Sequence, residues 1–235
     1  MAQSAAIGIM CKAPQPGRTK TRLGAEIGAA GAARLSACFL RDVATAVECV
    51  PERLGRKGYA VYAPAGTEPA LRQLVPPSFD LLLQVDAEFG NVLHGAVRDL
   101  LAAGHDCVVL VNGDSPTLPP SLLVETVDAL RRAGDRVVLG PASDGGYYLI
   151  GLKRPHRRLF EDIPWGTAAV ADRTLDRARQ IGLEALVLPE WYDVDDTETL
   201  RWLQDELAGR SDRFGNGGAA PATRAYLAEM AKAAS

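Results

Sequence analysis

Short apolar runs alternate with longer segments of helical periodicity along almost the whole chain, and this alternation most constrains its fold. Seven runs have the length and composition of β-strands: Ala5–Met10, Tyr59–Tyr62, Leu81–Val85, Cys107–Val111, Arg136–Gly140, Tyr147–Gly151 and Ala185–Leu188. The run Cys107–Val111 is the most apolar and is expected at the centre of the sheet. The chain has no repeat of fixed period. The sequence therefore predicts an α/β fold with one open, mostly parallel sheet and helices on both faces.

Helical segments separate the predicted strands. They are expected at Glu26–Val50, Thr67–Val75, Gly90–Ala103, Pro119–Ala133, Ala168–Ile181 and Asp196–Leu207, with a single helical turn at Pro155–Phe160. The stretch Gly209–Pro221 has the composition of a linker. Ala222–Ala234 is a short helical segment that packs back, reaches a partner subunit or frays. We therefore predict a main domain over residues 1–208 and a tail over residues 209–235.

Bulk composition narrows the class of protein. The chain has 235 residues and a formal net charge of −3, which argues against a general nucleic-acid-binding surface. The apolar runs are shorter than the ~18 residues that a membrane span needs, so no membrane contact is expected. The four cysteines form no CxxC pair, which favours buried, reduced thiols in a cytoplasmic protein. A homodimer is compatible with the sequence, which carries no signal for or against it.

A basic loop follows the first predicted strand. The segment from Lys12 to Leu23 contains Lys12, Arg18, Lys20 and Arg22, whereas the first acidic residue of the chain is Glu26. Its proline and glycine residues prevent a helix until after the turn. In α/β proteins, loops at this position commonly bind phosphate. Since the segment fits neither the Walker A pattern nor GxGxxG, we expect its side chains to bind phosphate. The alternative is a solvated loop that happens to be basic.

Two carboxylate-bearing loops follow predicted strands near the middle of the chain. Asp114 lies in the sequence Asn-Gly-Asp-Ser-Pro directly after the most apolar run, where a carboxylate suits a hard divalent cation. The alternative there is an Asx-turn or a helix cap made by Asp114 or Ser115. Asp144 precedes two glycines in a second loop, which is also compatible with a simple hairpin turn. Tyr147 and Tyr148 come next and are expected on opposite faces of a strand.

A third acidic segment follows the last predicted strand. The sequence EWYDVDDTE, residues 190–198, contains five acids and no basic residue. Asp196 or Thr197 can cap the next helix, and a second metal ligand would account for another acid. Asp193 also begins a DxDxT pattern, which haloacid-dehalogenase-like phosphatases use as a nucleophile motif. That motif opens its domain, however, and here only about forty residues follow it.

One basic loop and at least two carboxylate loops are thus expected at the same edge of the sheet, because ligands bind beyond the carboxyl ends of parallel strands. Cations bind phosphates, carboxylates bind Mg²⁺ or Mn²⁺, and the metal bridges to the phosphates. This layout is typical of phosphoryl or pyrophosphate chemistry.

These motifs together resemble one bacterial family, the GT-A-like or rSAM/selenodomain-associated transferases of the nucleotide-diphospho-sugar transferase superfamily. The resemblance covers Ala5 to about Leu207. It rests on KxPxPGxxKTRL from Lys12, GDSP from Gly113, GPAxDGGYYLIGL from Gly140, and DVD from Asp193. The loop that contains Lys20 is also similar to its counterpart in 2-phospholactate guanylyltransferase. Gly113-Asp114-Ser115 stands where sugar transferases usually carry DxD.

The resemblance implies a Rossmann-like α/β/α sandwich of the GT-A type and a transferase activity on a nucleotide-activated substrate. It implies that Asp114 is the principal ligand of Mg²⁺ or Mn²⁺, with Asp195 or Asp193 as the second. The substrate would be a nucleoside triphosphate or a nucleotide-diphospho-sugar, together with a small-molecule acceptor.

From the residues and the resemblance together, we predict a metal-dependent nucleotidyltransferase or glycosyltransferase. Its expected catalytic residues are Lys20, Arg22 and Asp114, and its expected substrate-binding residues are Lys12, Arg18, Asp144, Gly145, Gly146 and Tyr147. Four cations in the basic loop favour a triphosphate donor, because pyrophosphate is a highly charged leaving group, and Lys20 is expected to provide most of that preference. The alternative is a non-catalytic nucleotide-binding module.

Overall fold

The computed structural model describes residues 4–233, and its centre is a seven-stranded sheet of order β3-β2-β1-β4-β6-β5-β7. The strands are β1 (Ala5–Lys12), β2 (Arg56–Ala63), β3 (Asp80–Leu83), β4 (Cys107–Asn112), β5 (Arg136–Pro141), β6 (Tyr147–Leu152) and β7 (Glu184–Val187). β6 is antiparallel to both of its neighbours, and the other adjacent strands are parallel. The prediction of a mostly parallel α/β sheet is confirmed, and the seven predicted runs are the seven strands.

The helices follow the predicted order with one correction. They are α1 (Thr21–Ile27), α2 (Ala29–Glu48), α3 (Glu68–Arg72), α4 (Phe89–Ala102), α5 (Pro120–Arg131), α6 (Val170–Gln180), α7 (Thr197–Leu207) and α8 (Pro221–Ala233). The predicted helix Glu26–Val50 is confirmed over Ala29–Glu48 as α2, but its start is wrong because residues before Gly28 belong to a separate helix, α1. Gly28 separates α1 from α2 with a φ of 82°, a left-handed value that favours glycine. The expected turn at Pro155–Phe160 is a 3₁₀ helix at Arg157–Phe160, and Ala234 lies outside the described residues.

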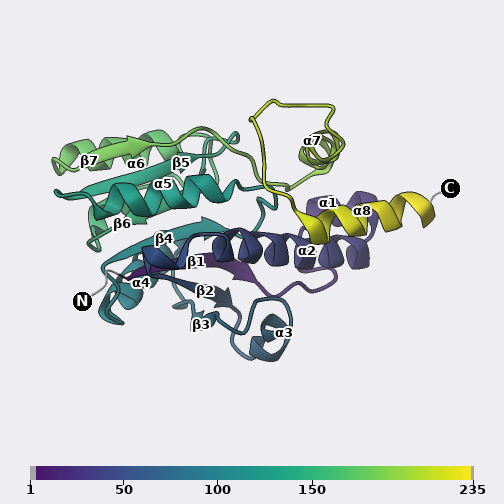
Figure 1. Cartoon of the computed structure of the whole chain (residues 1–235), viewed down its shortest axis with the longest axis horizontal. Helices are drawn as coiled ribbons and strands as arrows, with labels where there is room; N and C mark the ends of the chain where they lie inside the picture. The colour runs from purple at the N-terminus through teal and green to yellow at the C-terminus, as the bar shows by residue number, and fades with distance from the viewer. Residues whose placement is uncertain (1–3, 234–235) are drawn as a thin grey trace.

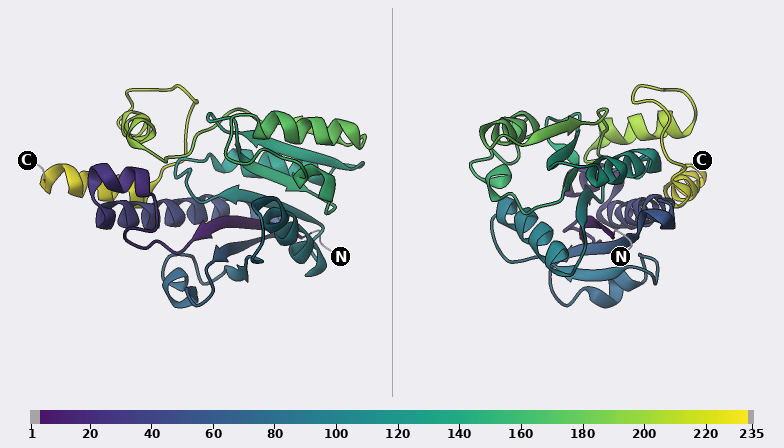
Figure 2. Two further views of the ribbon diagram at one scale, coloured as in Figure 1. Left: turned by 180° about the vertical axis from the view of Figure 1, so that it is seen from behind. Right: turned by 60° about the vertical axis from the view of Figure 1, so that its left-hand side comes forward.

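Helices cover both faces of the sheet (Figure 1). α2 and α5 pack on one face, in a core cluster that includes Phe39, Leu123 and Val109. α4 and α6 pack on the other face, in a second cluster that includes Val97, Leu110 and Ala178. In Figure 2 the view from behind brings α4 and α6 to the front of the sheet. The residues of β4 from Cys107 to Val111 are at most 2% exposed, which confirms that this run is central.

The C-terminal segment packs back onto the main domain. α8 lies along α2 in Figure 1, with Tyr226 buried between them. The Asp42 carboxylate of α2 accepts hydrogen bonds from the backbone N–H groups of Ala222 and Thr223, at 2.9 and 2.8 Å. The Arg34 guanidinium lies 4.6 Å from the ring centroid of Tyr226. The division at residue 208 stays a prediction, but the tail is packed rather than extended.

The cysteines only partly match the expectation of buried thiols. Cys38 and Cys107 are buried, Cys11 is half-buried, and Cys49 is exposed because it comes directly after the end of α2. All four are free thiols. Among the helices formed by residues 4–233, none has both the length and the apolar character required to cross a membrane.

Candidate functional site

The loops that carry the predicted site residues meet at one edge of the sheet. The loops after β1, β4, β5 and β7 all leave the carboxyl ends of parallel strands, and the antiparallel β6 begins at the same edge. Hydrogen bonds fix two of these loops to each other. The N–H of Val194 donates to the Asp114 carbonyl at 3.0 Å, and the Ser115 hydroxyl donates to the Tyr192 carbonyl at 2.7 Å. These bonds bring the carboxylates of Asp114 and Asp195 to the same place.

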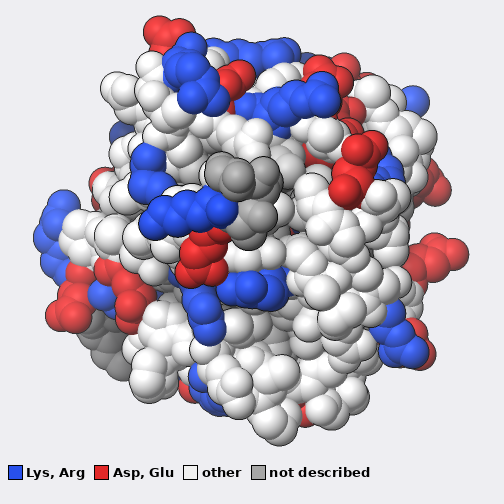
Figure 3. All heavy atoms as spheres, turned by 90° about the vertical axis from the view of Figure 1, so that its right-hand side faces the viewer, with Lys and Arg blue, Asp and Glu red and all other residues white. Residues whose placement is uncertain are grey.

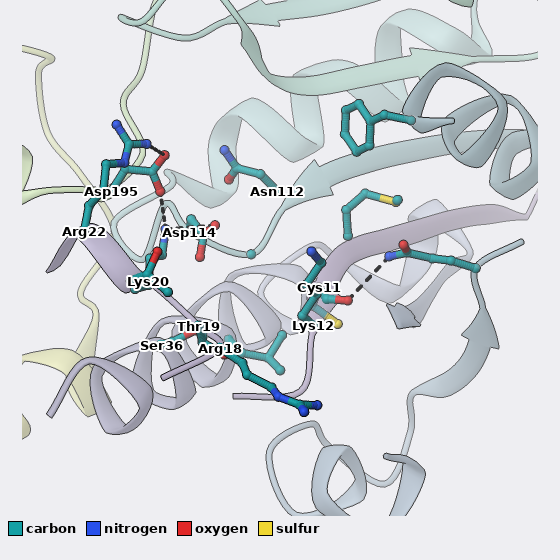
Figure 4. A pocket seen from close by; sticks show the side chains of 16 residues that line it. Cys11, Lys12, Arg18, Thr19, Lys20, Arg22, Ser36, Asn112, Asp114 and Asp195 are labelled. Atoms are coloured by element: carbon teal, nitrogen blue, oxygen red, sulfur yellow. Dashed lines mark hydrogen bonds and ion pairs between the residues drawn. The ribbon is translucent and has the colours of Figure 1, made fainter. Parts of the chain in front are cut away.

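Lys20 lies between those two carboxylates. Its ammonium nitrogen is 2.9 Å from Asp114 Oδ2 and 2.5 Å from Asp195 Oδ1, and its side chain is only 5% exposed. Its backbone has a φ of 50°, in the left-handed region that a lysine seldom adopts. Arg22 contacts the other side of Asp195 at 3.1 Å but is largely exposed. Figure 4 shows this chain of alternating charges from Asp114 through Lys20 and Asp195 to Arg22.

Charges in this cluster are strongly coupled. Burial would lower the pKa of Lys20, but the carboxylates of Asp114 and Asp195 outweigh it and raise the pKa above its ordinary value. Burial raises the pKa of Asp193 to about 7, and the neighbouring Asp195 and Asp144 add to this effect. Several acids therefore share a small volume in which added positive charge is favourable.

The donor set fits a divalent cation that also contacts a substrate. Among residues 4–233, no group of three or more His, Cys, Asp or Glu side chains surrounds a common metal position. The Lys20 ammonium nevertheless lies within contact distance of two carboxylates, and these groups can accept a cation. Mg²⁺ characteristically takes one or two carboxylates and completes its shell with water and substrate phosphates. Asp114 and Asp195 match that requirement, and Asp193 lies beside them.

The basic loop forms one wall of a cavity of about 470 Å³. It is lined by the four cations of the loop, by Asp114 and Asp195, and by Gln84, Asn112 and Phe89. Within the described part of the chain, Lys12 and Arg18 form no ion pair, in contrast to Lys20 and Arg22. In Figure 4 these two free cations lie in a different part of the cavity from the Lys20 cluster. In Figure 3, which looks onto the right-hand side of Figure 1, Lys and Arg are mixed with Asp and Glu.

A second cavity of about 480 Å³ adjoins the first, and both are lined by Met10, Arg22, Phe89, Asn112 and Asp195. The loop after β5, the start of β6, the segment before α6 and the loop after β7 complete it, so that Asp144, Gly146, Tyr147, Trp165 and Asp193 also line it. Two oxygens of lining residues, Asn112 Oδ1 and the Tyr147 hydroxyl, are buried and have no hydrogen-bond partner among the described residues.

The predicted substrate-binding residues differ in what the structure assigns to them. Asp144 is exposed, and its carboxylate accepts a hydrogen bond from the Gly146 N–H at 2.8 Å, which is the turn geometry of the alternative interpretation. Gly145 has a φ of 85°, and a Cβ there would lie 2.2 Å from the Ala168 carbonyl oxygen, so glycine is needed for this close approach, and its predicted substrate contact stays a prediction. Tyr148 is buried and donates to the Pro189 carbonyl at 3.0 Å.

The acidic segment contains a helix cap, as predicted. Asp196 is the N-cap of α7, and its carboxylate accepts from the Thr199 N–H at 2.9 Å, with Thr199 completing a capping box. The phosphatase pattern that begins at Asp193 comes after β7, at the end of the strand order and late in the chain. That position is inconsistent with a nucleophile motif that opens its domain.

Sequence reasoning missed Phe89, Asn112 and Trp165, all of which line the second cavity. Asn112 directly follows the apolar run of β4, so its place at a strand end was a usable signal. Phe89 and Trp165 are isolated aromatic residues in polar surroundings, and their ring centroids are 5.0 Å apart. Nothing in the sequence indicates that they meet.

Comparisons with known proteins identify a family and similar sequences. A family model described as "Uncharacterized protein conserved in bacteria (DUF2064)" matches residues 47–167, which is just over half of the chain. The chain is also 30% identical over 157 residues to N-acetylmuramic acid 6-phosphate etherase from Streptomyces coelicolor. That match covers 64% of this chain but only 46% of the etherase, so the chain spans less than half the length of this curated relative.

Solved structures share the fold. A "putative nucleotide-diphospho-sugar transferase" from Desulfovibrio desulfuricans G20 superposes with a TM-score of 0.84 at 30% identity, over 98% of this chain and 96% of that one. CMP:2-keto-3-deoxy-manno-octonic acid synthetase complexed with CTP has a TM-score of 0.58 at 13% identity, with 89% and 100% covered. Glucosyl-3-phosphoglycerate synthase from Mycobacterium tuberculosis, with Mn²⁺, UDP and phosphoglyceric acid, has a TM-score of 0.51 at 13% identity, with 86% and 74% covered. The last two similarities concern the fold.

Proposed function

Because the chain belongs to the DUF2064 family and is a transferase of the nucleotide-diphospho-sugar transferase superfamily, we propose that it is a metal-dependent enzyme that transfers a group from a nucleotide-activated donor to a small-molecule acceptor. One observation carries this proposal. The same cavity holds two cations that form no ion pair with residues 4–233, Lys12 and Arg18, and two carboxylates that already hold a cation, Asp114 and Asp195.

We propose a division of roles that follows from this arrangement. Lys12 and Arg18 bind the phosphates of the donor, because both line the cavity and neither forms an ion pair within the described part of the chain. Asp114 and Asp195, with Asp193 beside them, would hold Mg²⁺ or Mn²⁺, which would supply positive charge to the departing nucleoside diphosphate. Lys20 neutralises both carboxylates when metal is absent, and Arg22 pairs with Asp195. Tyr147, Asp144 and Gly146 belong to the adjoining acceptor cavity.

The donor that we propose is a nucleotide-diphospho-sugar rather than a nucleoside triphosphate. The expectation of a triphosphate rested on four free cations in the basic loop. In the structure Lys20 and Arg22 are paired with carboxylates, which leaves two for the phosphates. Two cations and a metal ion suffice for a diphosphate leaving group. The Desulfovibrio structure, the neighbour with 30% identity, is named as a transferase with this class of donor.

Narrower expectations from the sequence are part of the same proposal. We propose a relationship to the GT-A-like transferases and to 2-phospholactate guanylyltransferase, supported by the basic loop that follows β1. A cytoplasmic location is supported by four free thiols. For the oligomeric state we propose only that a homodimer is compatible with the sequence.

Calorimetry with a panel of diphospho-sugars and nucleoside triphosphates, each with Mg²⁺ or Mn²⁺, tests the proposal. We expect a diphospho-sugar to bind tighter than the matching triphosphate, and only with metal. Arg18→Ala is expected to weaken it about tenfold or more, since a charged hydrogen bond contributes roughly 1.5–3 kcal/mol. Asp114→Asn is expected to abolish metal-dependent binding in a folded protein. Arg173→Ala, an exposed arginine of α6 outside both cavities, is the control.

Three outcomes would lead elsewhere. Tighter binding of a triphosphate would favour nucleotidyl transfer. Unchanged Mn²⁺ affinity in Asp114→Asn would return Asp114 to the role of a turn residue. Tight donor binding without turnover against any acceptor would favour the non-catalytic nucleotide-binding module.

A further inference from the structure

We propose that the second cavity binds the acceptor as an uncharged or cationic alcohol or amine with an apolar body, and that it rejects phosphorylated and carboxylated molecules. This inference rests on the proposed function only where it gives the ligand the role of acceptor. The chemistry of the cavity follows from its wall, its buried polar atoms and its charge, which are independent observations.

Part of the cavity wall is apolar, and polar side chains line a similar share of it. The apolar part contains Met10, Leu93, Leu110, Val111, Ile150 and Val170, of which all but Met10 are buried or nearly so in the fold. Such a surface releases water when it is covered by an apolar group, and a sugar phosphate or a small carboxylate offers little apolar area for this purpose. A ligand of this cavity therefore carries a ring or an alkyl group.

Aromatic side chains give one side of the cavity a defined shape. The Phe89 ring meets the Trp165 ring edge-on, with centroids 5.0 Å apart and planes at 88°, and the Tyr147 ring lies 6.2 Å from Trp165. Gly90 permits this approach, since a Cβ there would lie 3.1 Å from Trp165 Nε1 and 2.4 Å from the Phe160 carbonyl. Phe89 is 51% exposed, although large apolar side chains are usually buried. A ring of the ligand would cover this face.

Two buried polar atoms indicate what the ligand presents at its other end. Asn112 Oδ1 and the Tyr147 hydroxyl have no hydrogen-bond partner among residues 4–233, and both residues line the cavity. Buried polar atoms without partners are costly, so such atoms at a cavity wall suit a ligand that satisfies them. A hydroxyl group can donate to the amide oxygen of Asn112 and accept from the hydroxyl of Tyr147, and an ammonium group can donate to both oxygens.

Charge separates this cavity from its neighbour. Among the described residues that line it, Arg22 is the one cation, and its guanidinium is paired with Asp195 at 3.1 Å. Asp144, Asp193 and Asp195 line the same cavity. The first cavity has the unpaired Lys12 and Arg18 instead. In the absence of metal, an anionic molecule would enter an acidic environment in which the described lining residues offer no unpaired cation, which is unfavourable at these distances.

A series of probes with one body and different charges tests this inference. We would measure the binding of 2-phenylethanol, 2-phenylethylamine and phenylacetate to the full chain by ligand-observed NMR, without nucleotide or metal. The alcohol and the amine are expected to bind about tenfold or more tighter than phenylacetate. Trp165→Ala is expected to weaken both, whereas Trp202→Ala, in a different aromatic cluster, is expected to leave them unchanged. Tyr147→Phe keeps the ring and is expected to weaken the alcohol several-fold.

Phenylacetate binding as tight as that of the alcohol would overturn the inference. So would the absence of binding by both the alcohol and the amine, or equal binding to the wild type and to folded Trp165→Ala and Tyr147→Phe. Because no nucleotide is present, the result is separate from the donor test. Probe binding without donor binding would support the proposed chemistry of the cavity and contradict the proposed transferase role. Donor binding without probe binding would support the transferase role and contradict the proposed chemistry of the cavity.

Discussion

Lys20 lies at the centre of the cluster of charges in the candidate site. Its ammonium contacts both carboxylates that we propose as metal ligands, and its left-handed backbone conformation places it there. Backbone strain of this kind persists where surrounding contacts determine it, and it is frequent at functional sites. In the structure Lys20 therefore acts as an internal cation for Asp114 and Asp195. A divalent metal ion would compete with it for the same oxygens.

Lys20→Ala is expected to change the response to metal in a particular direction. Without its ammonium, the carboxylates of Asp114 and Asp195 face each other with less compensation, so the metal-free protein should melt at a lower temperature. Mn²⁺ should then bind tighter than in the wild type, and a tenfold gain in affinity adds about 1.4 kcal/mol of stabilisation at saturating metal. A thermal-shift titration with Mn²⁺ alone measures both effects.

Arg22→Ala is the matched control, because Arg22 is largely exposed and contacts only Asp195 of the pair. Its effect on the Mn²⁺ titration should be smaller. If Lys20→Ala responds to Mn²⁺ no more strongly than the wild type, Lys20 and the metal do not share these ligands.

At the scale of elements, the sequence determined which segments form strands but not how distant loops meet. Apolar runs such as Cys107–Val111 are local signals, and all seven became strands. The break at Gly28 was hidden because Ile27 continued the helical periodicity on its other side. The ion pairs of Lys20 and the contact of Phe89 with Trp165 depend on loops far apart in the chain. Asp114 and Asp195 could be expected at one sheet edge, whereas a lysine between them could not.

The cap of α7 gives a test at this scale. Asp196 caps the helix, so Asp196→Ala is expected to reduce the free energy of unfolding by about 0.5–2 kcal/mol and to leave Mn²⁺ binding unchanged. Hydrogen bonds from the Thr199 N–H lower the pKa of Asp196 below its ordinary value of 3.8. The contribution of the Asp196 carboxylate to the free energy of unfolding is therefore present above pH 3.8, and it is lost as the pH falls through the lower pKa of the folded state.

Denaturant unfolding of both proteins between neutral and acidic pH measures this difference. The difference in the free energy of unfolding between the wild type and Asp196→Ala should become smaller as the pH falls. Asp195→Asn, one residue earlier, should instead weaken Mn²⁺ binding. A loss of metal binding in Asp196→Ala would show that Asp196, and not Asp195, is the metal ligand.

At the scale of the whole molecule, the C-terminal segment supports the acidic loop. Phe214 stacks on Tyr192 with ring centroids 4.8 Å apart, and Tyr192 directly precedes Asp193. The Tyr192 hydroxyl and the Thr117 hydroxyl both donate to the Glu206 carboxylate, and the N–H of Gly218 donates to the Thr117 carbonyl at 2.7 Å. The segment that follows α7 thus connects the loop of Asp193 and Asp195 to the loop of Asp114.

A chain that ends at residue 208 is therefore expected to be less stable than the full chain, although the sequence predicted a main domain that ends there. Removing the tail exposes the α2 surface under Tyr226 and the ring of Tyr192.

The point variant Phe214→Ala should reduce the free energy of unfolding by about 1–3 kcal/mol, because it removes a partly buried aromatic side chain and its stacking contacts. Arg213→Ala, which removes an exposed cation over the rings of Trp202 and Phe214, should cost less. Melting temperatures of the four proteins, with and without Mn²⁺, measure both stability and the ordering of the acidic loop. Equal melting and equal Mn²⁺ response for the full and shortened chains would show that residues 1–208 fold and form the site on their own.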